Sequence, residues 1–187
     1  MKKDVILAGV GGQGVLSVAA VIAKAAVRSG FFVRQSEVHG MAQRGGAVLS
    51  HLRIADAAIA SDLVPRGSAD LIVSMEPLES LRYVDFLAPD GALIAADAPF
   101  INIPDYPDIS LVLKRIESFS IHRIIDAVAL GKSAGLSKAV NMVMVGAASL
   151  FLPISVENME KAIEEMFASK GQGMIDANKR AFELGRA

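Results

Sequence analysis

A cluster of glycines near the N-terminus has the spacing of a ligand-binding turn. The segment Gly9-Val10-Gly11-Gly12-Gln13-Gly14 fits the pattern G-x-G-x-x-G and lies between an apolar run and a stretch of helical composition. Glycines at these places permit a tight turn and a close approach of a ligand to the backbone. The helix N-terminus that follows attracts an anion. The candidate binding residues here are Gly11, Gly12, Gln13 and Gly14.

A second glycine-bounded segment, His39–Gly46, contains one arginine. The Arg44 guanidinium is a planar fork suited to a carboxylate or a phosphate, and Gly45 and Gly46 would let a ligand come close to the backbone. His39 is a candidate proton carrier because histidine titrates near neutral pH. The segment leaves the second expected strand, so we expect it beside the first glycine turn, at the carboxyl ends of the strands.

Composition and spacing exclude several kinds of site. The chain of 187 residues has no cysteine, which excludes disulfides, thiolate zinc sites, a cysteine nucleophile and iron–sulfur clusters held by thiolates of this chain. The three histidines have no spacing typical of a metal site, so we predict no bound metal. Gly131-Lys132-Ser133 looks like the end of a phosphate loop, but Asp126 stands where that motif needs a glycine.

Charge and hydropathy limit the partners of the chain. The 19 Lys and Arg residues against 20 Asp and Glu residues give a net charge of −1, so the basic footprint of a nucleic-acid-binding protein is absent. Hydrophobic residues make up 52% of the chain, a high share. The longest late apolar stretch, 139–154, is interrupted by polar residues and is shorter than the roughly 20 residues of a membrane span. We therefore predict no membrane segment.

The elements that must position the candidate residues alternate between strand and helix. An Ala-, Val- and Leu-rich stretch at 15–28, stopped by Gly30, predicts a helix, and Pro77 favours a helix up to Phe86. Pro89-Asp90-Gly91 predicts a turn. From Ser120 onward the pattern is helical only. Short apolar runs predict strands at 5–8, 31–38, 47–54, 69–75, 92–96 and 111–116.

This order of elements indicates an α/β fold. We expect a Rossmann-like open, mostly parallel sheet with flanking helices and a helical C-terminal portion. The length favours a single domain over residues 1–187. Within it we expect the sheet core at 1–117 and the helical portion at 118–187.

The glycine spacing by itself supports a free-standing NAD(P)- or flavin-binding oxidoreductase. A dinucleotide-binding fold has an acidic residue about 20 positions after the glycine turn, at the end of the second strand. Glu37 fits this place, since 37 − 14 = 23 residues separate it from Gly14. A glycine turn that only packs a helix against a sheet has the same pattern, and the chain would then be a non-catalytic interaction module.

Longer stretches resemble one family. Val5 to Val15 is similar to the opening of the gamma-type subunit or domain of 2-oxoacid:ferredoxin oxidoreductases. Ser36 to Gly46, followed by Ser50-His51-Leu52-Arg53-Ile54, resembles the indolepyruvate branch of that family. Other branches tend to have a tyrosine–glycine–proline–acidic stretch before Arg-Gly-Gly. Asp70 to Val73 and Asn141 to Ala147 also fit the family pattern, so the resemblance covers nearly the whole chain.

The resemblance implies a role in a larger enzyme. Such enzymes decarboxylate a 2-oxoacid on thiamine diphosphate with Mg, pass electrons through iron–sulfur clusters to ferredoxin and transfer the acyl group to coenzyme A. The family places these cofactors on a large alpha subunit, so we expect this chain to bind none alone. It implies a substrate and coenzyme A side at both glycine segments, where His39, Met41 and Gln43 would set the aryl branch.

Three further expectations concern partners and place. We expect a large apolar contact surface for the alpha subunit around Met142–Leu152, because this region is rich in apolar residues. Self-association of the isolated chain is a second expectation, and a cytoplasmic location is the third. No residue stands out as catalytic beyond His39, and the resemblance implies that the chain is inactive alone because the cofactors lie on the partner.

Overall fold

The computed structural model describes residues 1–39, 45–101, 103–136 and 139–187, and of His39 only the backbone. Its strands form one six-stranded sheet in the order β2-β3-β1-β4-β5-β6. The strands are β1 (Lys2–Val10), β2 (Phe32–His39), β3 (Ala47–Ala55), β4 (Ala69–Ser74), β5 (Leu87–Ala96) and β6 (His122–Ile125).

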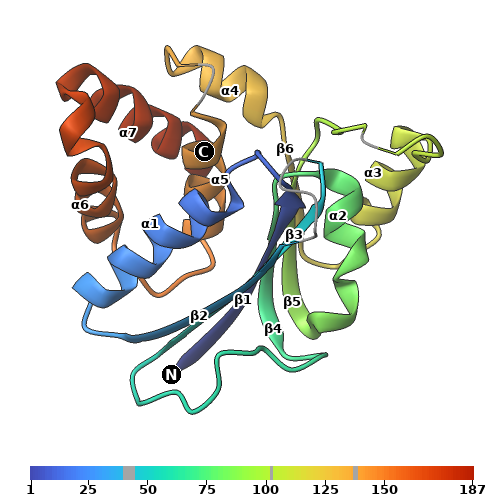
Figure 1. Cartoon of the computed structure of the whole chain (residues 1–187), viewed down its shortest axis with the longest axis horizontal. Coiled ribbons are helices and arrows are strands. Elements are labelled where there is room, and N and C mark those ends of the chain that lie inside the picture. The colour runs from blue at the N-terminus through green and yellow to red at the C-terminus, as the bar shows by residue number, and fades with distance from the viewer. Residues whose placement is uncertain (40–44, 102, 137–138) are drawn as a thin grey trace.

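Helices cover both faces of the sheet (Figure 1). One face carries α1 (Val15–Arg28), α4 (Ala127–Ser133), α5 (Val140–Ser149), α6 (Val156–Phe167) and α7 (Gln172–Arg186). The other carries α2 (Pro77–Arg82) and α3 (Ile109–Glu117), with short 3-10 turns at Val84–Phe86 and Ala168–Lys170 elsewhere in the chain. Because both faces are covered, the central strands are buried on both sides. Asp4 to Val10 of β1 is buried without a break.

The sheet is parallel except for β3. Strands β1, β4, β5 and β6 pair in parallel, whereas β3 is antiparallel to both β1 and β2. The expected open, mostly parallel sheet with flanking helices is confirmed. Because β3 is antiparallel to β1, it begins at the carboxyl end of β1, where Val10 pairs with Ala47.

Local patterns placed some boundaries correctly and one turn wrongly. The helix predicted at 15–28 has the bounds of α1. The turn predicted at Pro89-Asp90-Gly91 is wrong, since these residues lie within β5. They form an irregularity where the pairing with β4 shifts register between Ala69 and Leu71. A Cβ added at Gly91 would lie 2.7 Å from the Ala69 carbonyl oxygen, so glycine is needed where the strands crowd together.

The strand predicted at 111–116 is a helix, α3. Its first turn is capped by the Asp108 carboxylate, which accepts a hydrogen bond of 2.8 Å from the Ser110 N–H. Val112 and Ile116 are buried and four residues apart, the spacing of one helix face. The cap and this spacing outweigh the β-branched composition that suggested a strand.

The portion expected to be helical only contributes a strand. Residues His122–Ile125 form β6, which pairs in parallel with β5 at the edge of the sheet. The sheet core therefore extends beyond the boundary expected at residue 117. With four residues, β6 is too short to show a clear alternating pattern in the sequence.

The apolar surface expected around Met142–Leu152 is mostly buried inside the chain. Every residue of α5 from Met142 to Ser149 is buried. Helix α7 crosses α5 closely, because Gly146 and Gly185 lack side chains; a Cβ added at either would overlap backbone atoms of the other helix. The prediction that this region faces a partner is therefore wrong. Within the described ranges, no helix is long and apolar enough to cross a membrane.

Candidate functional site

The first glycine segment forms a tight turn between β1 and α1. The Gln13 N–H donates to the Val10 carbonyl at 3.0 Å, which closes the turn. Gly12 and Gly14 have φ values of +101° and +81°, a region that residues with a side chain rarely adopt. Gly14 is also the N-cap of α1 and provides no side-chain cap. The turn thus presents bare backbone at a helix N-terminus, as the sequence predicts.

The Gln13 side chain holds this turn in place. Its Oε1 accepts a hydrogen bond of 2.8 Å from the Val10 N–H, and its Nε2 donates at 3.1 Å to the carbonyl of Met75, just beyond β4. One amide therefore ties the ends of β1 and β4 together. Both of its polar atoms are engaged within the chain, which favours a positioning role for Gln13 over direct ligand contact.

The structure brings the two glycine segments together. The Gly11 N–H donates to the Gly46 carbonyl at 2.8 Å, and the Gly45 N–H donates to the Gly11 carbonyl at 3.4 Å. The predicted proximity of the segments is confirmed for these residues. Met41, Gln43, Arg44 and the side chain of His39 lie outside the described part of the chain. Their roles stay predictions.

Asn141 is a site residue that the sequence reasoning did not select. It lies in the first turn of α5, and its Nδ2 donates at 3.4 Å to the Gly14 carbonyl. It therefore joins α5 to the glycine turn across 127 positions of sequence. The available signal was a lone amide inside an apolar stretch, which the sequence analysis included in the family pattern without giving it a role.

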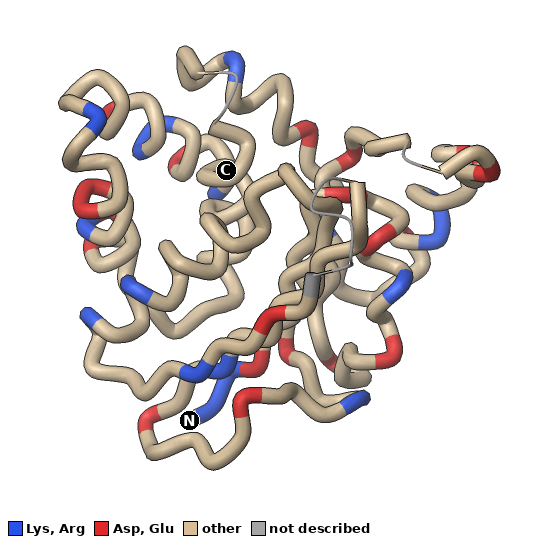
Figure 2. The backbone as a smooth tube through the Cα atoms, viewed as in Figure 1, with Lys and Arg blue, Asp and Glu red and all other residues tan. Residues whose placement is uncertain are grey.

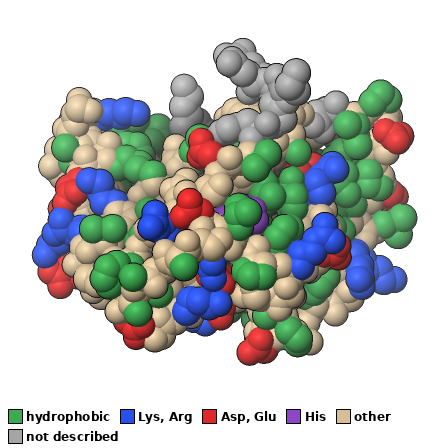
Figure 3. Space-filling view, turned by 60° about the horizontal axis from the view of Figure 1, so that its bottom comes forward, with side chains coloured by type: hydrophobic (Ala, Val, Ile, Leu, Met, Phe, Trp, Pro, Cys, Tyr) green, Lys and Arg blue, Asp and Glu red, His purple; other side chains and the backbone are tan. Residues whose placement is uncertain are grey.

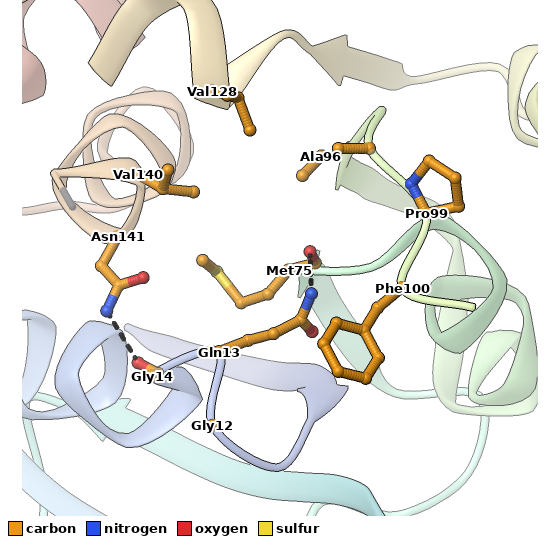
Figure 4. Close-up of a pocket in the computed structure, with 11 residues that line it drawn as sticks. Gly12, Gln13, Gly14, Met75, Ala96, Pro99, Phe100, Val128, Val140 and Asn141 are labelled. Atoms are coloured by element: carbon orange, nitrogen blue, oxygen red, sulfur yellow. Dashed lines mark hydrogen bonds between the residues drawn. The ribbon is translucent and has the colours of Figure 1, made fainter. Parts of the chain in front are cut away.

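A cavity of about 530 Å³ opens beside the glycine turn. It lies at the carboxyl ends of β1, β4 and β5, with α4 and α5 on the opposite side (Figure 4). Among the residues that the structure describes, its lining carries no charged side chain and is mostly apolar. The lining residues are Gly12, Gln13, Gly14, Met75, Ala96, Ala98, Pro99, Phe100, Val128, Val140 and Asn141.

A buried carboxylate fixes one wall of the cavity. Glu76 caps α2 through its Oε2, which accepts a hydrogen bond of 2.8 Å from the Glu79 N–H. Its Oε1 accepts from the Phe100 N–H at 3.2 Å and from the Tyr106 hydroxyl. Burial and the neighbouring Glu76 carboxylate raise the pKa of Tyr106, so its hydroxyl stays a donor. The sequence analysis did not predict these hydrogen bonds, because Glu76 is far from Phe100 and Tyr106 in the chain.

The strand order weakens the dinucleotide-binding hypothesis. Glu37 pairs with Ser50 of β3, and β3 separates β2 from β1. In a dinucleotide-binding fold the strand with the acidic residue neighbours the strand of the glycine turn. Glu37 therefore lies one strand too far from the turn for that role.

The described residues offer no cluster of side chains for a metal ion, and the sequence offers no thiolate for an iron–sulfur cluster. In the part that the structure describes, no group of three or more His, Asp or Glu residues could hold a metal ion. The whole sequence has no cysteine to ligate an iron–sulfur cluster. The site offers backbone groups, amides and an apolar cavity, which can bind and orient a ligand.

Comparison with known proteins identifies the family. Residues 4–187 match the pyruvate ferredoxin/flavodoxin oxidoreductase family. The chain is 35% identical to indolepyruvate oxidoreductase subunit IorB of Archaeoglobus fulgidus, over 99% of this chain and 94% of that one. It is also 35% identical to IorB of Thermococcus kodakarensis, over 97% and 93%.

Solved structures agree with the fold. Pyruvate oxidoreductase subunit PORC of Thermotoga maritima is 27% identical, with a TM-score of 0.74 over 99% of this chain and 95% of that one. A 2-oxoglutarate:ferredoxin oxidoreductase of Magnetococcus marinus has a TM-score of 0.79 at 22% identity. This chain corresponds to 30% of that longer one. The chain belongs to the pyruvate ferredoxin/flavodoxin oxidoreductase family.

Proposed function

We propose that this chain is the small subunit, free of cofactors, of an indolepyruvate:ferredoxin oxidoreductase. The complex would convert an arylpyruvate, coenzyme A and oxidised ferredoxin to the aryl-acetyl-CoA, carbon dioxide and reduced ferredoxin. The two electrons left when the carboxylate departs as carbon dioxide go to ferredoxin, and the proton of the coenzyme A thiol is released. The full-length similarity to IorB subunits carries this proposal. This similarity supports neither of the two alternatives, a free-standing dinucleotide-binding oxidoreductase and a non-catalytic interaction module.

The cofactors of the reaction belong to the partner in this proposal. The iron–sulfur clusters would lie on the large alpha subunit, since this chain has no cysteine to ligate them, and thiamine diphosphate with Mg would lie there as well. The chain alone would then be inactive. The cytoplasm, where we expect ferredoxin and this complex to meet, is part of the same proposal.

The joined glycine segments are the proposed contact to the substrate and coenzyme A. Gly11, Gly45 and Gly46 share backbone hydrogen bonds, and Arg44 directly precedes Gly45 in the chain. A guanidinium at that position of the sequence suits the carboxylate of a 2-oxoacid or a phosphate of coenzyme A. Glycine at both segments permits a ligand or the partner subunit to approach the backbone.

Co-purification tests the subunit assignment. We expect an affinity-tagged form of this chain, expressed in its native cells, to retain a large subunit that contains thiamine diphosphate and iron–sulfur clusters. The retained complex should reduce ferredoxin with indolepyruvate and coenzyme A. A chain that purifies alone, or with a partner that lacks these cofactors, would contradict the proposal.

The role of Arg44 is tested in the reconstituted complex. We expect Arg44→Ala to raise the KM for coenzyme A or for indolepyruvate about ten-fold or more, because a charge-assisted contact contributes about 1.5–3 kcal/mol. Arg44→Lys keeps the charge but loses the fork and should be affected less. Unchanged KM values for both substrates in Arg44→Ala would assign the loop a scaffold role.

Self-association of the isolated chain is proposed through β2. This strand lies at the edge of the described sheet, and its Phe32 and Val38 side chains are 52% and 57% exposed. Both residues are three positions from Gln35. An antiparallel pair of β2 strands centred on Gln35 would thus place each Phe32 beside a Val38 of the second copy.

The absence of native cysteine makes this pairing testable. We expect Gln35→Cys to form a covalent dimer with a short thiol cross-linker, because the two introduced thiols would face each other across the pair. Val27→Cys, on the exposed end of α1, is the matched control and should stay monomeric. Equal yields of dimer from both variants would contradict this pairing.

A further inference from the structure

The cavity beside the glycine turn lies where open α/β sheets bind ligands. After β1 the chain crosses one face of the sheet through α1 towards β2, and after β4 it crosses the other face through α2 towards β5. Neighbouring strands β1 and β4 thus send their connections to opposite faces, which opens a crevice at their carboxyl ends. The cavity is placed there, and its volume of about 530 Å³ is within the range of small-molecule sites.

The lining of the cavity selects against charge. Among the described lining residues, Gln13 and Asn141 supply the only polar side chains, and none is Lys, Arg, Asp or Glu. A phosphate or carboxylate placed inside would lose its hydration without gaining a counter-charge from these described residues. Met75, Phe100, Val128 and Val140 offer the thioether, ring and branched carbon atoms that pack against a flat apolar group.

One acceptor in the cavity has no partner among the described residues. Asn141 Nδ2 is bonded to the Gly14 carbonyl, and no hydrogen bond to Asn141 Oδ1 is seen in the described ranges. Figure 4 shows this oxygen turned towards the space between Met75 and Val140. The contact with Gly14 fixes the orientation of the amide, so Oδ1 can accept from an N–H that enters the cavity.

The cavity is open to a ligand from outside. Phe100 and Val128 lie on its rim and are 42% and 37% exposed. The Phe100 backbone is held by Glu76, so this side of the rim has a fixed position. An apolar, partly exposed rim with a fixed wall suits the entry of a ring.

We propose that this cavity binds the aryl ring of the 2-oxoacid as an uncharged, flat ring whose N–H donates to Asn141 Oδ1. The proposal rests on the proposed function and specifies the substrate class of that site. The oxoacid end of the substrate carries the negative charge and stays outside the cavity. The adenine of coenzyme A is also flat and uncharged and carries N–H groups. The test must therefore distinguish the aryl ring of the substrate from this adenine.

Binding of small probes to the purified chain is the first experiment. Heteronuclear NMR titrations use indole, 1-methylindole and adenosine. We expect indole to shift the signals of Gly12, Gly14 and Asn141, and 1-methylindole, which lacks the N–H, to bind about five-fold more weakly. In Asn141→Leu the two indoles should bind equally. Adenosine binding without indole binding would overturn the aryl assignment, and so would binding of neither probe.

Activity of the reconstituted complex is the second experiment. Val128→Arg places a long charged side chain on the rim, and Val27→Arg is the matched control, 61% exposed on α1 and absent from the cavity lining. We expect Val128→Arg to raise the KM for indolepyruvate at least about ten-fold over that of the control. Unchanged KM values would overturn the inference. If the Val128→Arg complex still forms and turns over normally, only the cavity inference fails and the proposed function stands. Failure of the proposed function would instead appear as a chain that forms no active complex.

Discussion

The two ends of β1 differ in how their polar groups are satisfied. At the amino end, Asp4 is fully buried and faces the Arg53 guanidinium at 2.8 Å and the Lys2 ammonium at 2.7 Å, while its N–H donates to Asp70. At the carboxyl end the turn has only glycines and Gln13, held by backbone and amide hydrogen bonds. Figure 2 shows acidic and basic residues close together at the amino end.

This difference separates a structural end from the end that is proposed to bind a ligand. The Arg53 guanidinium also donates to the carbonyls of Ser61 and Leu63, so it anchors the loop that follows β3. Figure 3 looks onto this side of the molecule, where basic, acidic and apolar side chains are interspersed. Paired charges leave little capacity for a ligand. The carboxyl end instead has a cavity whose described lining residues carry no charge, with one acceptor that lacks a partner among the described residues.

The largest effect should come from the amino end. We expect Arg53→Met to lower the free energy of unfolding by about 3 kcal/mol or more, because it leaves the Asp4 carboxylate buried without its main partner. Lys2 stays near Asp4 but is half exposed and compensates only in part. Urea unfolding of the purified chain measures the change, and indole binding by the folded fraction should be unaffected.

A double variant sharpens this prediction. Asp4→Asn in the Arg53→Met background removes the unpaired charge and should restore part of the lost free energy. If the double variant is as unstable as the sum of both single variants, the two side chains do not interact as described. The amino end would then not be the structural end of the sheet.

A smaller effect is expected at the carboxyl end. Gly14→Ala should destabilise the chain by about 1–3 kcal/mol, since Gly14 has φ +81° and an added Cβ would overlap the Asn141 amide. Adding Asn141→Ala removes the overlap and should leave about 1–2 kcal/mol of backbone cost. Thermal unfolding of the single and the double variant measures both changes in stability.

A second glycine provides the control. Gly173 lies in α7 with ordinary φ and no atom near an added Cβ, so Gly173→Ala should be neutral or stabilising by up to about 1 kcal/mol. A Gly14→Ala variant as stable as Gly173→Ala would show that the turn does not require its left-handed conformation.

The fold was predictable where local signals agree with tertiary contacts. The bounds of α1 follow from its apolar period and Gly30, and the strands of the sheet centre follow from continuous apolar runs. The failures lie where distant residues decide. Gly91 meets Ala69 of another strand, and Gly146 meets Gly185 of another helix. The sequence around Gly146 does not indicate that α7 packs over this glycine. The buried helix α5 was therefore wrongly predicted to be a surface for a partner.

The site shows the same division. The sequence predicted that the segments around Gly11 and Gly46 meet, because both follow strands that end at one edge. It did not predict Asn141 or Glu76, whose partners Gly14, Phe100 and Tyr106 are 24 to 127 positions away. An isolated polar residue in an apolar stretch was the available signal, and its partner could not be read from spacing.

The smallest effect concerns His51, which pairs with Ile6 midway between the two ends. Its Nδ1 accepts a hydrogen bond of 3.2 Å from the Val64 N–H, and its ring packs edge-on against Phe86. Burial, with the nearby Arg53 charge, lowers the pKa of His51 from its ordinary value of 6.5. The folded chain therefore holds neutral histidine, whereas the unfolded chain takes up a proton below pH 6.5.

The sign of the pH dependence follows from this difference. Stability due to His51 is fully present above pH 6.5 and is lost as the pH falls from there towards the lower pKa of the folded state. We expect the melting temperature of the wild type to fall more between pH 8 and pH 5.5 than that of His51→Asn, which keeps an acceptor but does not titrate. Carboxylates titrate alike in the wild type and in His51→Asn, so their effect on the melting temperature cancels in the comparison. If the melting temperatures of both proteins change equally with pH, His51 is as well solvated in the folded chain as in the unfolded one. The middle of β1 would then be a third region, accessible to water, between the two ends.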